Sequence, residues 1–145
     1  PYRAPEPYLS QYAGDPYAGE VAWVDAALAP LLDRLAAEPR PTLVIVTSDH
    51  GESLGEHGEL THGIFAYDAT LRVPLIVAEV RPGQAAAPRG RVVDAPARHI
   101  DLVPTIVELT GAGADAALPG ASLVPLVNGA GASPRPSYFE AMTPY

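Results

Sequence analysis

A run of six residues, Thr42–Thr47 (TLVIVT), places the strongest constraint on how this chain can fold. The run is short, apolar and rich in β-branched side chains, which is typical of a strand buried on both faces of a parallel sheet. Directly after it comes Ser48–Gly63, a polar segment with four glycines and three of the chain's four histidines. Because ligands of open α/β sheets gather outside the carboxyl ends of the strands, this segment is the first candidate for a functional loop.

Upstream of this strand the pattern predicts one long helix. Asp15 is a candidate N-cap and Pro16 suits the first helical position, so the helix should begin there and end before Pro39. Pro30 falls inside it and predicts a kink or a short break. Residues 1–17 are rich in Pro, Tyr and Gly without a period, which predicts an irregular lead-in whose aromatic side chains pack. The apolar side of the helix is Val21, Val24, Leu28, Leu31, Leu32 and Leu35.

Downstream the same alternation continues. Pro74–Ala78 predicts a second buried strand, reached through a helical turn at Tyr67–Leu71, and Arg91–Val93 predicts a shorter strand. Asp101 is the expected N-cap of a helix that Gly111 closes. Strands that alternate with helices predict an α/β fold with a mainly parallel β-sheet flanked by helices. Two short segments complete the prediction, an apolar piece at Leu123–Val127 and the start of a strand at Tyr138–Glu140.

Composition excludes several classes of function. Nine basic residues against seventeen acidic ones give a formal net charge of −8, and such a field repels nucleic-acid backbones, so we expect no nucleic-acid partner. Cysteine is absent, which removes a thiol nucleophile and Cys-ligated zinc. The longest apolar stretches fall far short of the ~20 residues that a membrane helix needs, so we expect no membrane segment in this chain. Nothing in the sequence indicates a cellular location, because it carries no targeting signal.

The polar loop contains side chains suited to a metal site. Asp49 offers a hard oxygen ligand and His50 an imidazole nitrogen, and together they suit Zn²⁺ or Mn²⁺ without excluding Ca²⁺. An isolated Asp-His pair is more often a capping Asp beside a solvated His, so this pair alone does not decide the matter. For His57 we favour a structural role.

Residues 51–55 also fit the G-x-S-x-G pattern of α/β-hydrolases, with Ser53 as nucleophile. In this sequence, however, the Ser lies several residues beyond the strand rather than at a tight strand-to-helix turn.

Five motifs in fixed order show a resemblance to a known family. Their order and spacing across residues 42–111 resemble the sulfatase family of the alkaline phosphatase superfamily. The resemblance implies the α/β fold of that superfamily and a hydrolase that acts on sulfuric esters. The motifs are Val44–Glu52 (VIVTSDHGE), Leu54–Gly58 (LGEHG), Thr61–Gly63 (THG), Leu71–Ile76 (LRVPLI) and His99–Thr105 (HIDLVPT).

The resemblance also implies roles for individual residues. Asp49 and His50 occupy positions of metal ligands, where many sulfatases carry Asp-Asn and bind Ca²⁺. The resemblance therefore implies a divalent metal. The family favours Ca²⁺, and the Asp-His pair is also compatible with Mn²⁺ or Zn²⁺. His62 matches a Lys or His that contacts the transferred group or its leaving oxygen, and it is our candidate catalytic residue. We assign structural roles to the other residues at recurring positions, because a loop carboxylate, a strand-flanking Arg and a helix N-cap have ordinary structural explanations. These are Glu52, Arg72 and Asp101.

One part of the family pattern is missing. Sulfatases carry a formylglycine nucleophile made from Cys or Ser in a Cys/Ser-x-Pro-x-Arg motif, and this sequence has no such motif. We therefore expect residues 1–145 to be an incomplete part of a sulfatase catalytic domain: a lead-in at 1–17, a motif-bearing α/β part at 18–111 and a loop-rich end at 112–145. The expected partners are a small-molecule or glycan sulfate ester and the missing N-terminal part of the same protein. Alone, the chain should be inactive and prone to self-association.

Two alternatives to a sulfatase stay open. Phosphoethanolamine transferases of the same superfamily also show a Ser-Asp-His-Gly-Glu-Ser-Leu-Gly-Glu stretch followed by His-Gly, so phosphoryl transfer of the transferase or phosphodiesterase type is the nearer one. The segments at 71–76 and 99–105 favour a sulfatase. The second alternative is a catalytically inactive module that keeps the motifs only as a scaffold.

Overall fold

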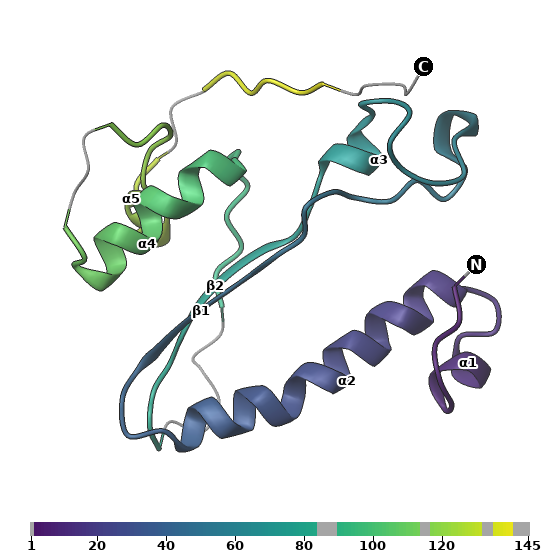
Figure 1. Cartoon of the computed structure of the whole chain (residues 1–145), viewed down its shortest axis with the longest axis horizontal. Coiled ribbons are helices and arrows are strands. Elements are labelled where there is room, and N and C mark those ends of the chain that lie inside the picture. Colours follow the sequence, from purple (N-terminus) through teal and green to yellow (C-terminus); the bar gives the residue numbers. More distant parts are fainter. Residues whose placement is uncertain (1, 84–89, 114–116, 132–134, 141–145) are drawn as a thin grey trace. The chain divides into compact units, whose positions relative to one another are not determined.

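A computed structural model describes residues 2–83, 90–113, 117–131 and 135–140 of the chain (Figure 1). It divides into two compact units. The first unit comprises Pro1–Gly51 with Arg72–Pro88, and the second comprises Glu52–Leu71 with Arg89–Tyr145. The boundary at Gly51 falls inside the polar loop, so the two halves of that loop are described with different units.

The first unit begins with two helices, α1 (Tyr8–Gln11) and α2 (Pro16–Ala37). The predicted N-cap is confirmed, since the Asp15 carboxylate accepts a hydrogen bond from the Ala18 N–H at 3.0 Å. The helix ends before Pro39 as expected. Of the kink or short break predicted at Pro30, the break is wrong, because α2 runs through that residue. A proline inside a helix removes only one backbone hydrogen bond, and the remaining turns of this 22-residue helix hold it together.

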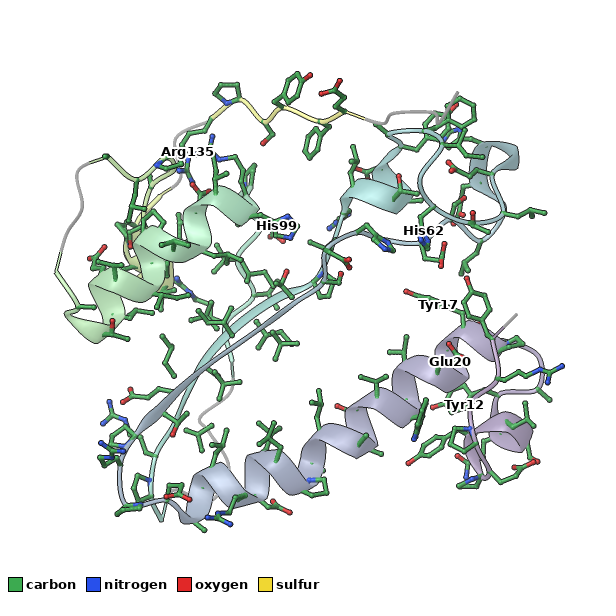
Figure 2. All side chains as sticks on the ribbon, in the orientation of Figure 1. Tyr12, Tyr17, Glu20, His62, His99 and Arg135 are labelled. Atoms are coloured by element: carbon green, nitrogen blue, oxygen red, sulfur yellow. The ribbon has the colours of Figure 1, made fainter. Side chains whose placement is uncertain are left out.

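The lead-in packs against the start of α2 and is not wholly irregular, because it contains α1. Gly19 makes the close approach possible: a Cβ there would lie 3.1 Å from the Cβ of Tyr12 and 3.4 Å from the Tyr8 carbonyl oxygen. The rings of Tyr2 and Tyr17 meet edge to face with centroids 5.3 Å apart. Figure 2 shows Tyr12 and Tyr17 at this end of α2, and the predicted packing role of the aromatic side chains is confirmed.

Two strands form the sheet of the first unit, β1 (Thr42–Thr47) and β2 (Leu75–Val80). They lie side by side in Figure 1 and pair antiparallel, with Thr42 opposite Val80 and Thr47 opposite Leu75. The mainly parallel sheet that the sequence predicts is not confirmed, because the pair of strands in the described residues is antiparallel. A parallel neighbour needs a crossover that returns along the strand, whereas the segment between β1 and β2 holds helices of only three and four residues.

The expected double-sided burial of the strands is also not seen. β1 is half-buried over its first five residues, and β2 alternates between half-buried and exposed positions up to Ala78, with Ile76 56% exposed. Such alternation is typical of a sheet with one solvated face.

None of the helices among the described residues combines the length and the apolar character that a membrane crossing requires.

The second unit contains short helical elements joined by loops: η1 (Glu56–Gly58), α3 (Asp68–Leu71), η2 (His99–Asp101), α4 (Leu102–Thr110) and α5 (Val124–Val127). The helical turn, the helix closed by Gly111 in a left-handed conformation (φ 68°) and the short apolar piece are all confirmed. The strands predicted at Arg91–Val93 and Tyr138–Glu140 are wrong. Neither segment pairs with another within the described ranges, and the Arg91 guanidinium instead donates to the carbonyl oxygens of Leu126 and Val127.

Asp101 stands at the predicted N-cap position of α4, but its side chain instead joins three segments of the second unit. Its carboxylate is fully buried and makes no cap hydrogen bond to α4. It accepts hydrogen bonds from the guanidinium groups of Arg98 (2.9 and 3.2 Å) and Arg135 (3.0 Å twice), and from the Ala121 N–H (2.9 Å). Burial opposes ionisation, but the Arg98 hydrogen bond, the Ala121 amide and the Arg135 charge outweigh it and lower the pKa of Asp101 to about 2.

Candidate active site

The candidate metal ligands Asp49 and His50 lie directly after β1 in the first unit. The turn that carries them is held by its own polar groups: Ser48 Oγ donates to the His50 carbonyl oxygen at 3.0 Å, and the His50 N–H donates to Asp49 Oδ1 at 3.1 Å. His50 Nδ1 lies 2.7 Å from the Gly51 carbonyl oxygen. A carbonyl oxygen can only accept, so Nδ1 carries the proton, and in the neutral ring the lone pair is on Nε2.

This arrangement fits a divalent metal. In metal centres a ligating His characteristically donates its other N–H to a backbone carbonyl or carboxylate, as His50 does to Gly51. His50 Nε2 lies 3.8 Å from Asp49 Oδ1, within the span of two metal–ligand bonds of ~2 Å each, so one ion can contact both atoms. The Asp49 side chain is 90% exposed and therefore accessible to an ion. Among the residues that the structure describes, no group of three or more acidic or histidine side chains is placed to hold a metal, so Asp49 and His50 would need further ligands.

In the second unit, the rest of the polar loop folds around Ser53. This serine is 1% exposed, and its hydroxyl donates to the carbonyl oxygens of Glu59 (2.6 Å) and Glu56 (3.2 Å). A nucleophile elbow presents its Oγ to the substrate, so this burial argues against Ser53 as the nucleophile of an α/β-hydrolase. His57 adopts a positive φ of 57° and stacks on Tyr67 with ring centroids 4.1 Å apart, which gives it a packing role.

The candidate catalytic residue His62 contacts a carboxylate in this loop. Its Nδ1 lies 3.0 Å from Glu52 Oε1, and Figure 2 shows the His62 side chain in the loop that leads to α3. The Glu52 side chain is 16% exposed and that of His62 is 44% exposed, so the acceptor is the more buried of the two. An ionised carboxylate only accepts, so Nδ1 again carries the proton.

The sequence did not reveal this contact. Glu52 and His62 are ten residues apart, on no common helix face or strand, and only the path of the loop brings them together. That path uses Gly55 and Gly58, whose φ values of 116° and 78° are left-handed conformations that favour glycine. The glycines were the only available signal, and they predict a tight loop without indicating which side chains meet.

Comparison with known proteins identifies the family. The family model described as Sulfatase matches residues 2–112. An uncharacterized sulfatase, YidJ, of Escherichia coli (strain K12) is 37% identical over 105 residues, which cover 70% of this chain and 20% of that protein. Choline-sulfatase of Rhizobium meliloti (strain 1021) is 33% identical over 118 residues, 78% of this chain and 22% of the relative. The chain belongs to the sulfatase family, as the ordered motifs predicted.

A third relative has a name that describes more than one function. The multifunctional alkaline phosphatase superfamily protein PehA of Trinickia caryophylli is 38% identical over 87 residues, 59% of this chain and 16% of that protein. The chain therefore spans about a fifth of the length of the curated relatives that it matches.

Proposed function

We propose that the full-length protein containing this chain hydrolyses sulfuric esters of small molecules or glycans in a metal-dependent reaction. This chain supplies Asp49 and His50 as metal ligands and His62 as the group that contacts the leaving oxygen. The observation that carries the proposal is the pair next to β1, in which the Gly51 carbonyl oxygen fixes the His50 tautomer and Nε2 lies 3.8 Å from the Asp49 carboxylate. Membership of the sulfatase family supports the reaction class.

The chemistry divides between the metal and the side chains. When bound, a divalent ion neutralises charge on the sulfuryl oxygens and lowers the pKa of an attacking group. Asp49 contributes a negative oxygen and His50 a neutral nitrogen to that ion, a set that accommodates Ca²⁺, Mn²⁺ or Zn²⁺. His62 acts as an imidazolium with a proton on both nitrogens: it gives the Nε2 proton to the ester oxygen as the S–O bond breaks, so the alcohol leaves neutral and the ring is left with its proton on Nδ1. The nucleophile comes from outside this chain, because its sequence contains no Cys/Ser-x-Pro-x-Arg motif.

The isolated chain is expected to lack turnover and to self-associate. It has no nucleophile motif, and apolar side chains of α2 that the sequence assigns to a buried side are exposed, with Val24 at 52% and Leu31 at 53%. We propose that the remaining part of the same protein covers these residues. Activity measurements therefore require the full-length protein.

The test of the proposed function compares two substrates and three proteins: the wild type, one variant and one control. Wild-type full-length protein should hydrolyse an aryl sulfate faster than an aryl phosphodiester. His62→Ala should lower turnover of the sulfate by ~10²–10⁴-fold with unchanged metal content, as expected for loss of a general acid. Glu108→Gln, an exposed change on α4, is the control. Absence of sulfate hydrolysis in the wild type would overturn the proposal, and metal loss in His62→Ala would make this residue a ligand instead.

Phosphoryl transfer is the second candidate. Its support is the 38% identity to PehA, whose name describes a multifunctional alkaline phosphatase superfamily protein. The same assay separates the two candidates, because preferential cleavage of the phosphodiester would assign the chain to this branch.

A further inference from the structure

The loop after β1 contains three glutamates, and they have different partners. Glu56 accepts hydrogen bonds from the Leu54 N–H at 2.6 Å and from the Ser53 hydroxyl at 3.3 Å, and Glu59 accepts one from the Ile64 N–H at 3.0 Å. These contacts fix the loop's own shape. Glu52 instead contacts His62, with Oε1 3.0 Å from Nδ1, although it stands ten residues away in the sequence.

Two properties of Glu52 suit it to control an imidazole ring. Its side chain is 16% exposed, so its carboxylate is held in place and shielded from much of the solvent that would compete for the hydrogen bond. Its oxygens only accept, so the contact keeps a proton on Nδ1 in both the imidazolium and the neutral ring, restricts rotation of the ring, and leaves Nε2 as the nitrogen that gives up its proton. A carboxylate that fixes one imidazole nitrogen determines where the other nitrogen acts, which is how carboxylate–histidine pairs serve proton transfer.

We propose that Glu52 is a positioning residue that acts through His62: it fixes the orientation and tautomer of the ring so that Nε2 faces the leaving-group oxygen. The proposal rests on the catalytic role proposed for His62. It assigns to Glu52 a function that its sequence position, two residues after His50, does not reveal. Glu52 itself neither donates a proton nor contacts the substrate.

A double-mutant cycle in the full-length protein tests whether Glu52 acts through His62. Glu52→Gln should lower kcat for an unactivated alkyl sulfate by about 10–100-fold, the usual effect of losing an outer partner of a functional His, with KM and metal content unchanged. The Gln amide can present its NH2 as well as its oxygen to Nδ1 and carries no charge, so it no longer keeps the proton on Nδ1. The loss should be smaller for an aryl sulfate with a good leaving group, which needs less protonation. In a His62→Ala background the same change should alter kcat by less than ~2-fold, because the residue through which Glu52 acts is gone.

Glu56→Gln is the matched control for this cycle, since it makes the same substitution in the same loop at a carboxylate that contacts the loop itself. It should stay within about 3-fold of wild type for both substrates, because the amide oxygen of Gln can still accept from the Leu54 N–H. Equal losses in Glu52→Gln and Glu56→Gln would show a general effect on loop structure and overturn the proposal. Multiplicative losses for Glu52→Gln and His62→Ala would overturn it as well, since they would show independent action.

A second measurement separates this inference from the proposed function, because it needs no turnover. In protein labelled with ¹⁵N-histidine, the His62 ring, identified by its absence in His62→Gln, should give the nitrogen shifts of an Nδ1–H ring at a pH where the ring is neutral. Glu52→Ala should change those shifts, and Glu56→Gln should not. A neutral wild-type His62 ring with its proton on Nε2 would overturn the inference. A wild type that shows the expected shifts but hydrolyses no sulfate ester would confirm the contact and refute the proposed reaction.

Discussion

Replacing Asp101 by Asn tests most severely how the second unit is held together. The substitution keeps the size of the side chain and removes its charge, so what changes is the interaction with Arg98 and Arg135. Both guanidinium groups approach the carboxylate with two nitrogens, at 2.9–3.2 Å, and the Ala121 N–H donates to it from another segment at 2.9 Å. One side chain thus joins η2, the segment before α5 and the segment at residue 135.

The expected cost follows from the pKa and from burial. Lowering the pKa of Asp101 from 3.8 to about 2 corresponds to roughly 2 kcal/mol of stabilisation, since one pKa unit is ~1.4 kcal/mol. Breaking one side of a buried ion pair costs about 3–5 kcal/mol. The Arg98 and Arg135 side chains are 19% and 28% exposed and regain some hydration when released, so the lower end of that energy range applies. We expect Asp101→Asn to destabilise the second unit by about 2–3 kcal/mol.

Hydrogen exchange of backbone amides in the full-length protein measures this loss of stability in the second unit. Backbone amides of α4 and of residues 117–127 should exchange roughly 30- to 150-fold faster in Asp101→Asn, the factor that corresponds to ~2–3 kcal/mol, while those of α2 should not change. Glu108→Gln on the same helix should behave as wild type. The pKa of Asp101 is lowered in the folded state, so its contribution is present above about pH 4 and is lost as pH falls from about 3.8 to about 2. Unchanged exchange at pH 7, or a difference between the two proteins that stays constant down to pH 2, would refute the reasoning.

Three further predictions concern single hydrogen bonds or close approaches. Thr105→Val leaves the Leu123 N–H without the Oγ acceptor at 2.8 Å and should destabilise the second unit by ~1–3 kcal/mol. The measurement is faster hydrogen exchange of the α5 amides, and an unchanged exchange rate would contradict the prediction. Gly120→Ala should expose this unit to proteolysis, because a Cβ would lie 2.2 Å from a backbone carbonyl oxygen and φ is 92°; wild-type resistance to protease would argue against the close approach. Asp15→Ala removes the N-cap and should cost ~1 kcal/mol, measured as faster exchange in the first turn of α2, with Asp15→Asn close to wild type.

The sequence predicted those parts of the fold that local signals determine. The start of α2 follows from Asp15 and Pro16, and the end of α4 follows from Gly111, because a cap or a left-handed glycine acts within one helical turn. The two β-branched runs located β1 and β2. The predicted mainly parallel sheet was not confirmed, because the direction in which β1 and β2 pair depends on how the intervening chain returns and not on the strands themselves.

The contacts that sequence reasoning missed all join distant residues. Arg98 and Arg135 meet at Asp101 from positions 37 apart, and Glu52 meets His62 across a glycine-rich loop. No periodicity in the sequence predicts contacts of this kind. The family, in contrast, could be identified from the order of five motifs, and the match over residues 2–112 confirms it. The roles of Asp49, His50 and His62 stay predictions.

The most direct test of the central claim is the metal content of the full-length protein by mass spectrometry, wild type beside Asp49→Ala, with sulfate release from an aryl sulfate measured on the same samples. Asp33→Asn, an exposed change on α2, is the control. We expect stoichiometric divalent metal and sulfate release in the wild type and in Asp33→Asn, and loss of both in Asp49→Ala. Retention of metal and of turnover in Asp49→Ala would contradict the assignment of the residues after β1 as the metal site.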